Sequence, residues 1–177
     1  MYRLSKNMDI NEKTDLFLSV VQSNKGIIYK VANSYCKDVE DRKDLVQEII
    51  IQLWKAFDDY NDNFKHSTWM YRISLNVAIS FYRKESSRKK ISNPFTDGIF
   101  NFPDNDGIED KETDLGILQQ MIFQLKDFDK ALMLLYLEEK PHKEISQIIG
   151  ISESNVATKI NRIKNSLKQQ YSQLKTQ

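Results

Sequence analysis

The sequence has few of the residues that break helices or cross-link a chain. Its 177 residues include five glycines, three prolines and one cysteine. A single cysteine excludes an intrachain disulfide and is typical of a reducing compartment. No stretch approaches the roughly 20 consecutive apolar residues of a membrane span, and no apolar run of signal-peptide length follows Met1. We therefore expect a cytoplasmic protein with no membrane insertion.

The residue patterns of metal sites and of DNA-cleaving enzymes are also missing. His66 and His142 are isolated, with no cysteine or histidine at metal-ligand spacing. A recombinase needs a positioned serine or tyrosine nucleophile with an arginine cluster, or acids that hold a metal, and neither arrangement is visible. We expect no catalytic residue, no metal and no cofactor, and the protein is not predicted to be an enzyme.

Charge is abundant, and it is separated along the chain. The formal net charge is +1, but residues 81–90 contain five bases and one acid, whereas residues 104–114 contain six acids and one lysine. No acid follows Glu153. Two basic zones on either side of an acidic strip favour two separate contacts with a polyanion.

Apolar residues recur at helical spacing, and no strand pattern appears, so we predict an all-α fold. The first lobe is predicted to hold a short helix near residues 15–22, a longer one from Ile27 to Tyr35, one from Asp41 to about Asp58, and one capped by Ser67 or Thr68. About four helices are predicted after Leu115. We expect two small helical domains, residues 1–91 and 115–177, joined by a flexible acidic linker at residues 92–114 that is rich in turn signals.

Residues 141–168 have the pattern of a helix-turn-helix. Ile145, Ile148 and Ile149 mark one side of the first helix, Gly150 makes the turn, and Ser152 stands at an N-cap position. The second helix has a core stripe and a polar face that suits the major groove of duplex DNA. The stripe consists of Val156, Ile160, Ile163 and Leu167, and the polar face carries Asn155, Thr158, Lys159, Asn161, Arg162 and Lys164. The alternative is a plain helical hairpin with a solvated surface.

Two features of the first lobe are hard to explain as core. Asp44, Gln47 and Glu48 lie beside an apolar seam that includes Trp54, a surface able to pair with basic residues of a partner helix. The third long helix interleaves aromatic and basic residues, an arrangement that suits single-stranded DNA because rings stack on bases while cations follow phosphates. These residues are Trp69, Tyr71 and Tyr82 with Lys65, Arg72 and Arg83. The alternatives are a solvated helix face and buried aromatics with helix-end charge.

The order of these elements resembles a bacterial RNA polymerase sigma factor of the extracytoplasmic-function (ECF) group, group 4 of the sigma-70 family. The resemblance covers residues 25–90 and 118–168. It is carried by the Asp-x-x-Gln-Glu helix, the Thr-Trp-Met-Tyr-Arg-Ile-x-x-Asn helix, the acidic linker and the C-terminal helix-turn-helix, in that order. The long N-terminal region and central extra domain of housekeeping factors are missing, so we expect a minimal, alternative factor.

The resemblance implies binding to core RNA polymerase and to promoter DNA, both duplex and single-stranded, in order to direct promoter-specific initiation. The clamp helices of the largest polymerase subunit would contact Asp44, Gln47, Glu48 and Trp54. The element near the start site (the −10 element) would contact Asn61, Asn63, Phe64, Lys65, Trp69, Arg72, Asn76 and Arg83. The upstream −35 element would contact Asn155, Thr158, Lys159, Asn161 and Arg162.

Further partners follow from the same resemblance. The flap of the second polymerase subunit would meet a groove near Leu132 and Leu135, and an inhibitory anti-sigma factor is expected. The chain departs from the usual family pattern at Phe128, where leucine is common, at Ser146, where alanine is common, and at Ala157, where relatives often carry a base. The alternative function is an autonomous helix-turn-helix regulator that binds its site without polymerase.

Overall fold

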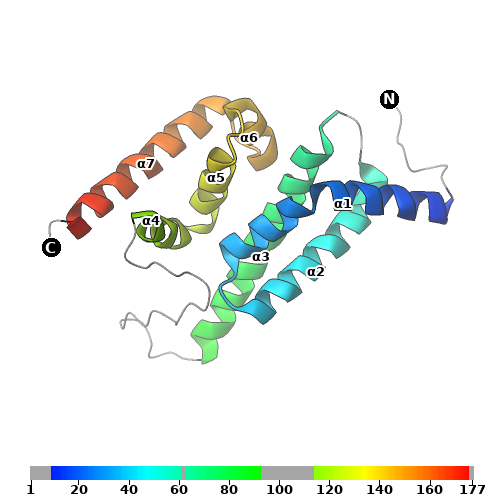
Figure 1. Cartoon of the computed structure of the whole chain (residues 1–177), viewed down its shortest axis with the longest axis horizontal. Coiled ribbons are helices and arrows are strands. Elements are labelled where there is room, and N and C mark those ends of the chain that lie inside the picture. The colour runs from blue at the N-terminus through cyan, green and yellow to red at the C-terminus, as the bar shows by residue number, and fades with distance from the viewer. Residues whose placement is uncertain (1–8, 61–62, 93–113, 176–177) are drawn as a thin grey trace.

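The computed structural model describes residues 9–60, 63–92 and 114–175, with side chains through residue 84 and again from 114 to 174. These residues form seven α-helices and one short 3-10 helix, and the described part of the chain contains no strand. The predicted all-α fold is confirmed. Figure 1 shows two helical lobes side by side, α1 to α3 in one and α4 to α7 in the other.

The first lobe begins with one long helix, α1 (Ile10–Tyr35). The prediction of a short helix followed by a longer one was wrong. Gly26 lies inside the helix, where glycine costs about 1 kcal/mol relative to alanine. A continuous buried stripe that runs from Phe17 to Tyr35 and packs on α2 and α3 outweighs this cost.

The second helix, α2 (Val39–Ala56), starts two residues before the predicted position. The Asp38 carboxylate accepts hydrogen bonds from the backbone amides of Glu40 and Asp41, and the N-cap therefore lies ahead of the acids chosen from the sequence. A single 3-10 turn, η1 (Phe57–Asp59), continues the helix to the predicted end near Asp58.

The third helix, α3 (His66–Ser92), begins at His66, so the predicted cap at Ser67 or Thr68 was wrong. Thr68 is buried inside the first turn of α3. Its hydroxyl donates to the Glu144 carboxylate of the second lobe at 3.1 Å, so the hydroxyl makes a contact between the lobes. The fully buried face of α3 packs against α1 and α2 and contains Met70, Tyr71, Ser74, Leu75 and Ala78.

The second lobe has the predicted four helices, α4 (Asp114–Phe123), α5 (Asp127–Leu137), α6 (His142–Ile149) and α7 (Glu153–Lys175). Helices α5 and α6 both pack against α7 and also against α1 or α3 of the first lobe. Of the predicted linker at residues 92–114, only Ser92 in α3 and Asp114 in α4 are described, and residues 93–113 lie outside the described ranges.

Candidate polymerase and nucleic-acid interfaces

A groove of about 780 Å³ runs between α2 and α3. Asp44, Gln47 and Glu48 line one wall, and Asn76 lies on the other wall. The apolar part of the lining includes Ile51, Ile73, Val77 and Phe81, and Gln52, Ser80 and Lys84 are further polar members. The groove thus combines an acidic and amide rim with an apolar interior, which suits an amphipathic helix that carries basic residues. Three of the four residues predicted to bind polymerase share this wall, and Asn76, predicted to bind DNA, faces them.

Trp54 lies apart from the groove. Its ring packs edge-on against Phe17 of α1, with centroids 5.0 Å apart, and the Lys13 ammonium lies 4.4 Å from the Trp54 ring. Lys13 also pairs with Asp58 at 2.7 Å. Trp54 therefore joins α1 to α2, and the structure does not bring it together with the other three predicted residues.

An aromatic cluster supports the chain where it enters α3. Tyr60 stacks on His66 at 4.6 Å and meets Trp69 edge-on at 5.2 Å, while its hydroxyl donates to the backbone carbonyl of Phe64 at 2.8 Å. Phe64 is 39% exposed. These contacts hold the backbone before α3 against the core and leave the Phe64 ring toward solvent.

The remaining residues predicted to bind the −10 element are spread over the start and the middle of α3. Asn63, Lys65 and Arg72 are exposed, and Trp69 is half-buried. Asn61 lies outside the described residues. Tyr71, expected to stack on bases, is 2% exposed, and that expectation was wrong because its position on α3 faces the core and the second lobe.

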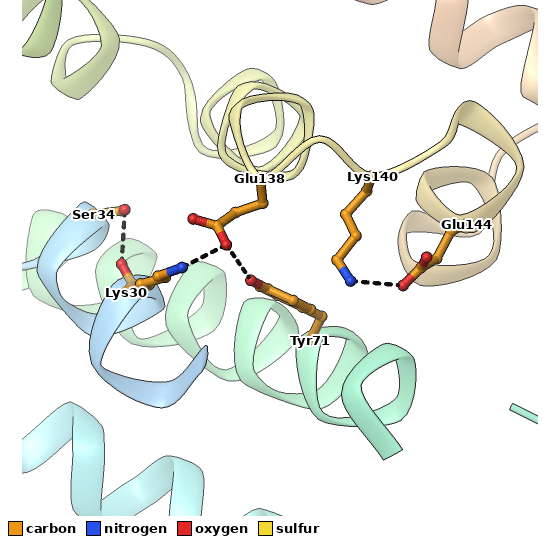
Figure 2. Close-up of polar contacts among 6 residues, drawn as sticks. All are labelled: Lys30, Ser34, Tyr71, Glu138, Lys140 and Glu144. Atoms are coloured by element: carbon orange, nitrogen blue, oxygen red, sulfur yellow. Dashed lines mark hydrogen bonds and ion pairs between the residues drawn. The ribbon is translucent and has the colours of Figure 1, made fainter. Parts of the chain in front are cut away.

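Arg83 and Tyr71 of α3 contact the second lobe directly. Arg83 pairs with Asp127 through Nε at 3.2 Å. Glu138 accepts from the Lys30 ammonium at 2.6 Å and from the Tyr71 hydroxyl at 3.3 Å, as Figure 2 shows. Burial raises the pKa of the Tyr71 phenol, and the negative charge of Glu138 raises it further. The interface between the lobes is therefore polar at its edge.

The centre of the interface contains a buried lysine. Lys130 is 1% exposed, and its Nζ lies 5.2 Å from the Tyr35 ring, 5.1 Å from the Tyr82 ring and 4.3 Å from the Phe123 ring. Among the described residues this ammonium has no hydrogen-bond partner. Burial lowers the pKa of Lys130, and the Asp127 carboxylate opposes that shift. Aromatic faces thus take the place that an acid would normally occupy.

Leu132 and Leu135, expected to offer a groove to the polymerase flap, are both 0% exposed. The expectation that these two side chains form a surface groove was wrong, because both belong to the hydrophobic core. Sequence reasoning also missed Lys130 and Glu138. In the sequence each resembles an ordinary surface charge on a helix. Only the packing of the two lobes shows that both lie at the interface.

The predicted helix-turn-helix is present. Gly150 has φ +82°, in the left-handed region, and its amide donates to the Ser146 carbonyl at 2.9 Å, which ends α6. The Ser152 hydroxyl accepts from the Asn155 amide at 3.3 Å, as an N-cap does. The predicted core stripe of α7 is buried at Val156, Ile160, Ile163 and Leu167.

The opposite side of α7 is polar and uncovered. Asn155, Thr158, Asn161 and Arg162 are all exposed, while Lys159 lies at the border of this face with its ammonium 5.4 Å from the Phe128 ring. The Thr158 hydroxyl donates to the Ser154 carbonyl within the helix. Four of the five residues predicted to read the upstream element therefore share one exposed face.

Two segments of the chain match known families. Residues 20–88 match Sigma-70 region 2, and residues 115–167 match Sigma-70, region 4. The chain is 30% identical over 166 residues to the ECF RNA polymerase sigma factor SigW of Bacillus subtilis (strain 168), an alignment that covers 88% of this chain and 89% of SigW. The chain belongs to the ECF sigma factors. It is thus an alternative sigma factor that directs promoter-specific transcription with RNA polymerase, and the family predicted from the sequence is confirmed.

This sigma factor is similar to further members of the group. It is 28% identical over 148 residues to SigM of Bacillus subtilis (strain 168), covering 81% of this chain and 88% of SigM. It is 24% identical over 151 residues to the sigma-E factor of Escherichia coli (strain K12), covering 78% and 79%. Each alignment is long enough to include parts of both lobes of this chain.

Two solved structures share the fold of this sigma factor. One is CnrH in complex with the cytosolic domain of CnrY, with a TM-score of 0.63, 17% identity and coverage of 90% of this chain and 89% of CnrH. The other is the sigma factor RpoE in complex with the anti-sigma factor NepR from Bartonella quintana, with a TM-score of 0.60, 18% identity and coverage of 90% and 96%. At these identities the likeness concerns the fold.

Two further properties of the described residues bear on this family. No three His, Cys, Asp or Glu side chains in the described ranges come together in a group that could hold a metal ion. Of the helices in those ranges, none combines the length and the apolar character needed to cross a membrane.

Proposed function

We propose that this sigma factor holds core RNA polymerase through α2 and reads a promoter at two places, with α3 and the residues before it at the −10 element and α7 at the −35 element. The observation that carries the proposal is the polar face of α7. It presents amide, hydroxyl and guanidinium groups on the side opposite the core, and no acid follows Glu153 to repel phosphates. We place the domain boundaries at residues 91/92 and 114/115.

The rim of the α2–α3 groove is the proposed polymerase contact. Glu48 accepts a hydrogen bond from the Gln52 side chain at 2.7 Å, which fixes the carboxylate at the groove wall beside Asp44 and Gln47. A basic helix on the clamp of the largest polymerase subunit would meet these acceptors while its apolar side fills the groove. Trp54 would stabilise α2 at a distance from the groove, because its ring packs against Phe17 of α1.

The proposed site for the −10 element lies at the start of α3. The exposed ring of Phe64 and the amide of Asn63 can take an unstacked base, while Lys65 and Arg72 face the backbone phosphates. Removing a base from the stack costs a few kcal/mol, which such a site offsets without ATP. Arg83, near the far end of α3, would exchange Asp127 for a phosphate when DNA binds. Asn61 and Trp69 complete the proposed set, and Asn76 borders both this site and the groove.

The proposed site for the −35 element is the face of α7 that carries Asn155, Thr158, Asn161 and Arg162, with Lys159 at its border. In a helix-turn-helix, the N-terminal part of the second helix enters the major groove. An arginine that contacts a guanine edge is worth about 1 to 3 kcal/mol of discrimination.

An anti-sigma factor is the proposed inhibitory partner. Two solved structures that share this fold are complexes, one of CnrH with the cytosolic domain of CnrY and one of RpoE with the anti-sigma factor NepR. Co-purification from cells tests this part of the proposal. Recovery of the chain with polymerase alone under every growth condition would contradict it. The proposed place of action is the cytoplasm, and the chain is proposed to act without a catalytic site of its own.

Reconstitution with core polymerase tests the main proposal. Genomic fragments are transcribed with and without the chain, and the 5′ ends of the transcripts are mapped. We expect start sites that appear only when the chain is present, each preceded by two shared sequence elements. Footprinting then maps the contacts at both elements. Binding of a duplex site without any start-site-specific transcript would instead favour an autonomous helix-turn-helix regulator.

A charge reversal in the groove tests the role of α2. Glu48→Lys places a like charge against a basic partner, and we expect it to weaken holoenzyme assembly by about tenfold or more. Glu40→Lys is the matched control, since Glu40 also lies on α2 but pairs with Lys43 outside the groove. Equal effects of the two substitutions would overturn the assignment of the groove.

A further inference from the structure

Two lysines of α7 are held by aromatic rings of α5. The Lys159 ammonium lies 5.4 Å from the centroid of the Phe128 ring. The Lys164 ammonium lies 5.1 Å from the centroid of the Tyr136 ring and donates to the Tyr136 hydroxyl at 3.1 Å. Phe128 lies in the first turn of α5 and Tyr136 in the last. Both rings are half-buried against the core, so they are fixed supports for the two cations.

The two lysines mark the borders of the exposed face of α7. They are five residues apart, which separates them by about 140° around the helix axis. On the shorter arc between them lies the buried stripe, which includes Ile160 and Ile163, and on the longer arc lies the polar face. A helix that inserts this polar face into the major groove therefore directs one lysine toward each wall of the groove, where the phosphates of the two strands run.

The group that holds a lysine determines how much of its positive charge remains available to a phosphate. A carboxylate would neutralise an ammonium and compete with phosphate, whereas an aromatic face attracts the cation and leaves its full charge in place. Within the described ranges, neither Lys159 nor Lys164 pairs with an acid, although acids hold other lysines such as Lys30 and Lys140. Lysine loses much rotamer freedom when it is ordered, so a side chain already held in the free protein loses less on binding.

We propose that Phe128 and Tyr136 are positioning residues that hold Lys159 and Lys164 for contact with the phosphates on either side of the major groove. The inference rests on the proposed reading of duplex DNA by α7 and adds Lys164 as a phosphate contact.

Binding of the holoenzyme to a promoter fragment, measured over a range of salt concentrations, tests the proposal. The variants are Phe128→Leu, Lys159→Ala and the double variant, together with Tyr136→Leu and Tyr136→Phe. We expect Phe128→Leu to weaken binding about two- to fivefold, the size of an exposed cation–π contact. Lys159→Ala should lower the slope of log affinity against log salt by about one. In the Lys159→Ala background, Phe128→Leu should have no further effect.

The tyrosine pair separates the ring from the hydroxyl. Tyr136→Leu removes both supports of Lys164, whereas Tyr136→Phe keeps the ring, so we expect the first variant to bind more weakly than the second. Thermal unfolding of each variant checks that the lobe is folded. A loss of affinity from Phe128→Leu that is the same with and without Lys159 would show a structural role only and overturn the inference.

Arg162→Ala separates a failure of the positioning role from a failure of the proposed contact between α7 and DNA. If Arg162→Ala weakens promoter binding and the aromatic variants do not, the positioning role is wrong and the reading by α7 stands. If Arg162→Ala, Lys159→Ala and the aromatic variants all leave affinity and salt slope unchanged, α7 does not touch DNA and the proposed function fails with the inference.

Discussion

The ammonium group of Lys130 lies 5.2 Å from the centroid of the Tyr35 ring, across the boundary between the two lobes. The Tyr35 hydroxyl in turn donates to the backbone carbonyl of Asp127 at 2.6 Å, three residues before the lysine. Burial of an ammonium without an acid is costly, and the surrounding rings offset part of that cost. The centre of this interface therefore combines close packing with an unfavourable charge.

Replacing Lys130 by methionine should stabilise the protein. Methionine fills a similar volume among Tyr35, Tyr82 and Phe123 without a charge to desolvate, and buried charges exchanged for apolar groups are often neutral or stabilising. We expect Lys130→Met to raise the free energy of unfolding by about 1 kcal/mol in urea denaturation. Lys126→Met, at an exposed position four residues earlier, is the control and should stay within about 0.5 kcal/mol of wild type. A clear loss of stability in Lys130→Met would contradict this account.

The same lysine predicts a dependence of stability on pH. Burial lowers the pKa of Lys130 below its ordinary value of 10.5 in the folded chain, so between the two values the unfolded chain binds more protons. The free energy of unfolding of wild type should therefore rise as pH approaches 10.5 from below, and the advantage of Lys130→Met should shrink. Denaturation of both proteins at a series of pH values from about 7 to 9.5 measures this difference.

The upper limit of that pH series is set by two tyrosines. Burial raises the pKa of both Tyr35 and Tyr71 above the ordinary value of 10.0, so their contribution to stability is present below pH 10.0 and is lost as pH rises further. An advantage of Lys130→Met that grew with pH over the series would contradict the lowered pKa of the lysine.

Glu138→Gln should loosen the edge of the interface. The carboxylate that holds Lys30 and Tyr71 becomes a neutral amide, which removes an ion pair and weakens the acceptor for the phenol. We expect a loss of about 1 kcal/mol in the free energy of unfolding. The pKa of Tyr71 should move toward its ordinary value, although burial, its main cause, keeps it raised. Ultraviolet titration of the tyrosines measures the shift. Glu40→Gln, which alters an exposed pair with Lys43, should leave the titration unchanged.

Gly26 and Gly150 predict opposite effects of substitution by alanine. Gly150→Ala places a side chain in the left-handed region at φ +82°, and we expect a loss of about 1 kcal/mol. Gly26→Ala, inside α1, meets nothing within 4 Å and should add about 0.5 to 1 kcal/mol. Equilibrium unfolding of both variants is the measurement. A gain from Gly150→Ala would show that the turn before α7 does not require this backbone conformation.

Arg162→Ala should weaken binding to the −35 element. Arg162 is exposed in the middle of the polar face of α7, and a base contact there is worth about 1 to 3 kcal/mol. Holoenzyme binding to promoters that differ at single upstream positions measures the effect. A base contact predicts that discrimination is lost at one position, whereas a phosphate contact predicts a uniform loss and a smaller salt slope. Unchanged binding would remove Arg162 from the interface.

The parts of the fold that depend on local signals were predictable from the sequence. The apolar period of α7, the left-handed Gly150 and the Ser152 cap each act within a few residues, so the helix-turn-helix was found. The continuity of α1 was missed because Gly26 weakens the local signal while packing on two other helices decides the outcome. The burial of Tyr71 and Lys130 depends on contacts with residues that lie dozens of positions away. Such contacts produce no periodic pattern in the sequence.

The candidate site shows the same division. Asp44, Gln47 and Glu48 fall on one wall because residues three and four apart share a helix face. Trp54 was predicted to join them because the apolar stripe of the helix is wide. Its ring instead packs against Phe17 of α1, a contact that the sequence of α2 alone does not reveal.

Helix α3 carries attachment points to the second lobe at two levels. Thr68 contacts α6 and Arg83 contacts α5, and their separation of fifteen positions corresponds to about 22 Å along the helix axis. A body fastened at two such distant points cannot pivot about one of them without straining the other. Detachment of the lobes from each other should therefore be an all-or-none event, with half-open arrangements scarcely populated.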